Sequence, residues 1–185
     1  MIQYLKLFRP AVLLLLVMTA ICGVVYTGII TGAAQLFFHG KANGGIITVT
    51  RDGGAEDIGS ALISQEFTQP KYLIGRPEEV SNLSPVSAEQ AALVKERIGW
   101  WNRFDPNNKA DVPADLAMAP GSAADPGVSP EAAEFQVPRI AKARNMPPDD
   151  VRAVIRKYTS GRFLGFIGEP WVNVLKVNLA LDGLI

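Results

Sequence analysis

The residues of this sequence that could perform acid–base or nucleophilic chemistry are few and far apart. Asp115, Asp125 and Glu169 are carboxylates that could act as an acid and a base, and Ser122 is a candidate nucleophile close to Asp125. Acid–base catalysis needs two such groups at one substrate, and the spacing of these three does not bring them together without tertiary folding. We therefore favour turn and helix-capping roles for the three carboxylates.

A hydrolytic triad also needs a base beside its nucleophile. The single histidine, His39, follows Phe37 and Phe38 and precedes a glycine-rich connector, which predicts a position at a membrane surface. The single cysteine, Cys22, lies in an apolar segment, so no disulfide and no transition-metal cluster is expected. From these residues we predict no catalytic group and no metal site.

Phosphate binding is equally poorly supported. The sequence contains neither the Gly-x4-Gly-Lys-Ser/Thr loop nor the Gly-x-Gly-x-x-Gly loop of nucleotide-binding proteins. The best alternative is residues 119–127 leading into a helix capped by Ser129, but this approach carries Asp125 and Glu131 and no lysine or arginine. We expect no tightly bound cofactor and an ATP dissociation constant no better than roughly millimolar.

The element that positions everything else is an apolar segment near the amino terminus. Residues 10–38 carry no formal charge, and 11 of the 20 residues from 11 to 30 are Leu, Ile or Val. Twenty helical residues cover about 30 Å, the thickness of a bilayer core, which predicts a transmembrane helix over residues 11–34. A cleaved secretory signal is the alternative, because Lys6 and Arg9 precede the segment, but its apolar run is longer than the usual 7 to 15 residues or so.

Charge predicts how the chain is oriented. Lys6, Arg9 and the amino terminus precede the span and only Lys41 closely follows it, so residues 1–10 are expected in the cytoplasm. A juxtamembrane linker over residues 35–45 and one periplasmic domain over residues 46–185 complete the organisation. The residues after position 40 include 16 basic and 18 acidic ones, a net charge of −2, which argues against nucleic acid as a partner.

Small residues recur along one side of the predicted span, and close approach of a second transmembrane helix needs such a surface. The opposite side carries Leu14, Val17, Ile21 and Val25. The alternative is that Gly and Thr are simply common in membrane helices. The predicted packing face consists of Thr19, Gly23, Thr27, Gly28, Thr31 and Gly32.

The remainder reads as a mixed α/β (α+β) domain. Residues 46–50 have the β-branched composition of a strand, and the punctuated residues 70–77 read as an extended loop. Ser87 opens a capping box for a helix to residue 98, and Ser129 with Pro130 opens another to Arg144. A shorter helix over residues 150–158, ended by Gly161, and an alternating strand over residues 171–181 follow.

Several motifs along the whole chain together resemble one known family, the C subunit of the Kdp-type potassium-transporting ATPase. They include GSALISQ (59–65), GRP (75–77), SNL (81–83), VPADL (112–116), DP (125–126), GFIGEP (165–170) and VNVL (172–175). The resemblance singles out eight positions for assembly or nucleotide contact: Gln65, Arg76, Asn82, Asp115, Asp125, Gln136, Arg139 and Asn173.

The resemblance implies a non-catalytic subunit of a high-affinity potassium importer in the bacterial inner membrane. Its partners would be a potassium-channel-like subunit, an ATP-hydrolysing subunit and a small single-span subunit, within membrane lipid. The family has also been proposed to act as a catalytic chaperone that binds ATP and raises the ATP affinity of the hydrolysing subunit. The topology predicted from charge places the domain on the side without ATP.

The sequence departs from the family pattern at several positions. Where the family usually reads Ser-Gly-Ser-Gly-Leu-Asp-Pro-His, this chain reads Pro-Gly-Ser-Ala-Ala-Asp-Pro-Gly over residues 120–127. It loses a serine, a leucine and the histidine, and Ala123, Ala124 and Gly127 are departures from the pattern. Trp171 stands where an arginine is usual, and Ser64 where a glycine is usual. The roles of these five positions stay open.

Two other classes of function remain as alternatives. One is a membrane-anchored periplasmic hydrolase that uses Asp125 or Ser122, and the other is a solute-binding domain. A pump subunit should co-purify with large membrane proteins, whereas an enzyme should act alone.

Overall fold

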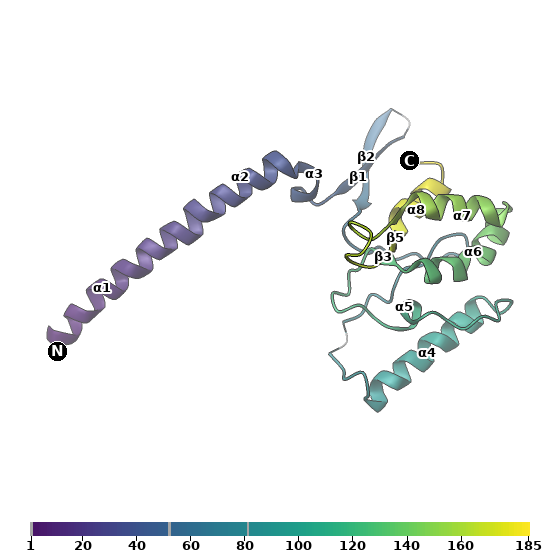
Figure 1. The fold of residues 1–185 in the computed structure, drawn as a ribbon, viewed down its shortest axis with the longest axis horizontal. Coiled ribbons are helices and arrows are strands. Elements are labelled where there is room, and N and C mark those ends of the chain that lie inside the picture. The colour runs from purple at the N-terminus through teal and green to yellow at the C-terminus, as the bar shows by residue number, and fades with distance from the viewer. Residues whose placement is uncertain (1, 52, 81) are drawn as a thin grey trace. The chain divides into compact units, whose positions relative to one another are not determined.

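The structure is a computed structural model that describes residues 2–51, 53–80 and 82–185, with side chains from Phe8 onward (Figure 1). The chain forms two compact units that meet in sequence between Gly45 and Ile46. Each unit has its own internal packing and is described separately.

The first unit is helical almost throughout. It contains α1 (Ile2–Thr19), the π-helical turn η1 (Ala20–Tyr26), α2 (Thr27–Phe37) and the short α3 (His39–Ala42). Within the described residues one segment, Phe8–Phe37, is long and apolar enough to cross a membrane. The hydroxyl of Thr27 donates to the Cys22 carbonyl five residues earlier, at 3.0 Å, where the helix is wound more loosely.

The second unit starts with a β-hairpin. Strands β1 (Ile46–Arg51) and β2 (Gly54–Ser60) pair antiparallel, from Ile46 opposite Ser60 to Arg51 opposite Gly54. The strand predicted over residues 46–50 is therefore confirmed.

Four helices follow, two of which begin at a serine cap. They are α4 (Ala88–Phe104), α5 (Ala114–Ala117), α6 (Pro130–Arg144) and α7 (Pro148–Lys157). The Ser87 hydroxyl accepts from the Gln90 amide and the Ser129 hydroxyl from the Ala132 amide, both at 3.1 Å, which confirms the two predicted caps. Helix α4 continues past the expected end at residue 98 because Trp101 and Phe104 join the core.

The shorter helix predicted over residues 150–158 is confirmed, but Gly161 does not end it. Helix α7 covers Pro148–Lys157, with Tyr158 as its cap. The Thr159 hydroxyl donates to the Ile155 carbonyl at 2.7 Å, and the chain turns directly into strand β4 (Thr159–Ser160). The helix ends because the following residues pair with the sheet, and no local sequence signal indicates this pairing.

The strand predicted over residues 171–181 was also mostly wrong. Strand β5 covers only Trp171–Asn173, and α8 (Val174–Leu181) follows at once. Asn173 caps this helix, because its Oδ1 accepts from the Lys176 amide at 3.0 Å. The helix is buried on nearly all sides, so its apolar residues show no clear helical period, and their alternation resembled a strand.

A small sheet and the helices share one core. Strand β5 pairs antiparallel with both β3 (Gly127–Val128) and β4, so the strand order is β3-β5-β4. Buried side chains from the helices meet β3, β5 and the irregular segment around Leu73. The chain is thus a small domain of mixed helix and sheet with one amino-terminal apolar helix.

Candidate functional site

The centre of the second unit is an irregular segment, residues 70–77, that pairs with no strand in the part of the chain that the structure describes. Buried side-chain amides take the place of a partner strand. Asn178 of α8 accepts from the Leu73 amide at 2.7 Å and donates to the Leu73 carbonyl at 2.9 Å. Gln136 of α6 does the same for Ile74, with both bonds at 2.9 Å. The loop that the sequence predicted is therefore hydrogen-bonded at Leu73 and Ile74 by side chains of α8 and α6.

Arg139 secures the beginning of this segment. Its guanidinium donates to the carbonyls of Pro70 and Tyr72, and to Gln136 Oε1 at 2.6 Å. Arg139 is only 7% exposed, and its guanidinium carbon lies 5.0 Å from the ring centre of Phe104. Burial lowers the pKa of Arg139 to about 10, against the opposing charge of Asp105, so the side chain is still a cation at neutral pH.

A second arginine ties the segment to the end of the chain. Arg144 donates to the carbonyls of Lys71 and Leu181, at 2.7 and 2.6 Å, and pairs with Asp182 at 2.7 Å. The Tyr72 hydroxyl donates to the same carboxylate at 2.9 Å. Burial raises the pKa of Asp182, but the hydrogen bonds from Arg144 and Tyr72 together outweigh burial, so the pKa lies below its ordinary value.

Sequence reasoning missed Asn178, Arg144 and Asp182. Asn178 lies within the strand predicted over residues 171–181 and was given no role, although it is almost completely buried. An asparagine within the apolar run VNVLKVNLAL is the one local signal that could have indicated a buried hydrogen-bonding role.

Near the end of the segment, Arg76 contacts the loop before α6. Arg76 Nη1 lies 3.3 Å from Asp125 Oδ2, and Nη2 donates to the Met118 carbonyl at 3.4 Å. Asp125 in turn accepts from the Gly127 amide at 3.0 Å. The structure therefore brings together two of the positions singled out by motif, Arg76 and Asp125, as an ion pair.

The three candidate carboxylates line one open depression of about 570 Å³ beside the start of α6. Each already has a donor. Asp115 accepts from the Ser129 amide at 2.7 Å, Asp125 has Arg76, and Glu169 pairs with Arg162 at 2.8 Å. Tertiary folding has brought together carboxylates that are far apart in the sequence. Each of them, however, makes a capping, turn or ion-pair contact within the chain.

A second cleft, of about 400 Å³, lies on the other side of Arg76 and includes Gln65, Arg97 and Trp100. Gln65 donates to the Ile58 carbonyl at 3.4 Å, and Arg97 pairs with Glu79 at 2.7 Å. Its two arginines thus face carboxylates of the same chain, so an anionic ligand would have to compete with them.

The remaining motif positions lie apart from these clefts. Asn173 donates to the Ala61 carbonyl at 2.9 Å, besides capping α8, and so joins the sheet to the end of the β-hairpin. Asn82 is exposed in the loop before α4. Ser122 accepts from the Ala124 amide at 3.3 Å within its own loop, and His39 lies in the first unit, 3.0 Å from Gln35.

Two of the departures from the family pattern contact one another. A Cβ added at Gly127 would lie 2.5 Å from Cε3 of Trp171, so the indole ring occupies the space that any side chain at position 127 would need. The glycine in place of histidine and the tryptophan in place of arginine therefore form a compatible pair. Ala123, another of the departures, takes a left-handed backbone with φ of 54°.

The small residues of the first unit leave space beside the helix. A Cβ added at Gly28 or Gly32 would meet nothing within 4 Å, and one at Gly23 would be 3.9 Å from Thr19 Cγ2. A larger residue at these positions would fit its own helix, so any effect of such a change would come from a neighbour.

Comparison with known proteins agrees with the motifs. The family model "KdpC: K+-transporting ATPase, c chain" matches residues 8–183. A protein of Listeria monocytogenes named potassium-transporting ATPase KdpC subunit is 48% identical over 98% of both chains. Proteins of the same name from Clostridium perfringens and Methylococcus capsulatus are 44% and 43% identical, over at least 96% of each chain. The chain belongs to the KdpC family, the c chains of K+-transporting ATPases.

Proposed function

We propose that this chain is a non-catalytic accessory subunit of an ATP-driven potassium importer. In this proposal Phe8–Phe37 spans the inner membrane, the amino terminus is cytoplasmic and the domain from Ile46 onward is periplasmic. Family membership over nearly the whole length and the names of the relatives support the role in potassium transport.

One observation carries the non-catalytic part of the proposal. The polar side chains at the centre of the domain bond the chain's own backbone: Gln136 holds Ile74, Arg139 holds Pro70 and Tyr72, and Asn173 holds Ala61. A catalytic constellation would direct such groups at one open point where substrate could lie. In this domain the polar side chains bond to the backbone and stabilise the fold, which suits a subunit that supports assembly.

The partners in this proposal are the potassium-channel-like, ATP-hydrolysing and small single-span subunits of the same pump. Purification of the tagged full chain from native membrane in mild detergent tests it. Co-purification of the ATP-hydrolysing chain is the expected result. Recovery of this chain alone, with a hydrolytic activity of its own, would favour the alternative of a membrane-anchored hydrolase.

The small-residue face is the proposed route to a partner helix. Gly23→Leu should insert normally but reduce recovery of the complex, because its Cβ meets only Thr19 Cγ2, at 3.9 Å, and the added side chain would displace a neighbouring helix. A loss on the order of 1 to 2 kcal/mol in association is expected. Val25→Leu, on the opposite side, is the control, and equal recovery of both variants would remove this face from the proposal.

We also propose that the chain does not bind ATP tightly. The depression at the start of α6 includes Asp115, Asp125, Glu131 and Glu169, and its arginines Arg76 and Arg162 are paired with carboxylates. A titration of the detergent-solubilised chain with a fluorescent ATP analogue, competed by unlabelled ATP, should give an affinity no better than about millimolar. A dissociation constant near 1 μM, about −8 kcal/mol, would instead favour the catalytic-chaperone role.

A further inference from the structure

The loop between β4 and β5 exposes a group of large apolar side chains. Phe163, Leu164, Phe166 and Ile167, here called the apolar hairpin, are 69%, 70%, 72% and 50% exposed. They are consecutive except for Gly165, and no charged residue lies among them. A patch of this kind on a soluble surface usually marks a contact with a membrane or another molecule.

The apolar hairpin has a defined shape. Phe163 and Ile167 exchange backbone hydrogen bonds of 2.8 and 2.9 Å, and Gly165 and Phe166 donate to Arg162 and Phe163 at 3.2 and 3.3 Å. Arg162 and Glu169 close its base as an ion pair. Four of the five backbone amides from Phe163 to Ile167 are thus satisfied inside the hairpin.

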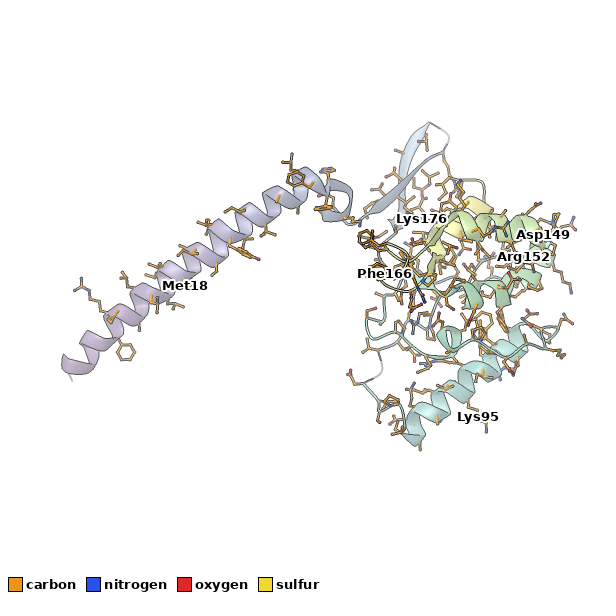
Figure 2. The ribbon with its side chains drawn as sticks, in the orientation of Figure 1. Met18, Lys95, Asp149, Arg152, Phe166 and Lys176 are labelled. Atoms are coloured by element: carbon orange, nitrogen blue, oxygen red, sulfur yellow. The ribbon has the colours of Figure 1, made fainter. Side chains whose placement is uncertain are left out.

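Its base lies at the end of the domain where the chain enters from the apolar helix. Ile46, the first residue of the domain, pairs with Ser60, and the next residue, Ala61, accepts from Asn173 two positions after Trp171. Exposed Ile46, Leu62 and Ile63 add further apolar surface there. Figure 2 shows Phe166 pointing away from the body of the domain at this edge.

Chain length limits how far this end can be from the bilayer. Eight residues, 38–45, separate the end of the apolar helix from Ile46, and a chain of that length reaches at most about 30 Å. Ile46, the first residue of the domain, therefore lies within about 30 Å of the end of the apolar helix.

We propose that the apolar hairpin inserts into the lipid interface of the membrane that holds the anchor helix; this rests on the anchoring proposed above. Lipid is favoured over a protein groove because the tip is uncharged and four of its five backbone amides bond internally, which lowers the cost of leaving water for an apolar phase. Phenylalanine with aliphatic neighbours is suited to the boundary between headgroups and acyl chains, and Trp171 follows directly at its base.

Depth-dependent fluorescence quenching tests this inference with the full chain in vesicles of phosphatidylethanolamine and phosphatidylglycerol. An uncharged fluorophore is attached at position 166 in a Phe166→Cys, Cys22→Ser chain, and acyl-brominated lipids serve as the quencher. We expect a blue-shifted emission that the brominated lipids quench. The same label at Lys95→Cys, exposed on α4, should not be quenched (Figure 2).

The native Cys22 separates this inference from the anchoring itself. A label at Cys22 should be quenched wherever the hairpin lies, so its failure would refute the anchor. Quenching at Cys22 without quenching at position 166 would overturn the hairpin proposal alone. A label at Ile167→Cys provides a second reporter, whose quenching should fall when Phe163→Asp is added. Shielding of position 166 only after other pump chains are added would show that the hairpin docks on protein, and would also overturn the proposal.

Discussion

Two buried side-chain amides hold the backbone at the centre of this domain. Asn178 and Gln136 each satisfy both the amide and the carbonyl of a residue far away in the sequence, Leu73 and Ile74. Burying a backbone group without a hydrogen-bond partner costs free energy of folding. Each of these two side chains therefore stabilises the fold more than a side chain that makes one ordinary hydrogen bond. Their shape and polarity are both required.

Replacing Asn178 by leucine tests that role. The variant keeps a side chain of similar size but leaves the amide and carbonyl of Leu73 buried without a partner. We expect the free energy of unfolding to fall by roughly 2 to 5 kcal/mol, measured by chemical denaturation in detergent. Asn102→Leu, exposed on α4, should change it by about 0.5 kcal/mol or less. Similar effects for the two variants would contradict the amide-clamp interpretation.

Asp182 gives the domain a predictable response to acid. Its pKa in the folded chain lies below the ordinary value of 3.8, so ionised Asp182 stabilises the fold above that value, and this contribution is lost as the pH falls through the lower folded pKa. Asp182→Asn should therefore destabilise the chain at neutral pH.

The difference between wild type and Asp182→Asn should narrow between about pH 5 and pH 2, as followed by urea denaturation at several pH values. Asp111→Asn, exposed in the loop before α5, is the matched control and should have little effect throughout. A difference that stays constant over this range would show that Asp182 stabilises by shape alone.

At the scale of elements, strands β3 and β5 depend on an unusual pair. Gly127 and Trp171 belong to these neighbouring strands, and the indole covers the glycine. The starts of α4 and α6, by contrast, are fixed by the local signals of Ser87 and Ser129. Here the fit between two strands decides which residues are tolerated.

A double-mutant cycle measures this fit. Gly127→Ala should destabilise the domain by about 1 to 3 kcal/mol, because its Cβ would lie 2.5 Å from the Trp171 ring. In a Trp171→Arg chain the same change should cost much less, with a coupling of about 0.5 to 3 kcal/mol. Thermal denaturation of the four proteins provides the numbers. Equal costs in both backgrounds would mean that the two departures are unrelated.

At the scale of the whole molecule, an apolar helix and a folded domain are joined by a short connector. The asymmetry between Lys6 and Arg9 before the span and Lys41 after it is the basis for the proposed sidedness. Both the role as a pump subunit and the lipid contact of the apolar hairpin require the domain to stay close to a membrane.

Protease accessibility tests the sidedness. Protease added to intact spheroplasts should remove a carboxy-terminal tag and digest the chain after Gly40, while a cytoplasmic marker protein stays intact. Protection of the domain until the membrane is broken would reverse the topology. That outcome would place the domain on the side where ATP is available.

The sequence alone determined the features that depend on neighbouring residues. Twenty-nine residues without a charge, 10–38, predict an apolar helix, and Ser129 with Pro130 predicts the start of α6. The end of that helix at Arg144 was also predicted correctly, because basic side chains suit a helix C-terminus. These signals act over a few residues and need no tertiary contact.

Only the tertiary structure decided how distant residues combine. Asn178 is 105 positions from Leu73, and Gln136 is 62 from Ile74, so no local pattern could assign their bonds. Helix α8 was mistaken for a strand for the same reason: burial on nearly all sides removes the polar face by which a helical period is recognised. The irregular segment, the ion pair of Arg76 with Asp125 and the fit of Gly127 to Trp171 all arise from packing between segments, and packing energies depend on partners that the sequence order does not reveal.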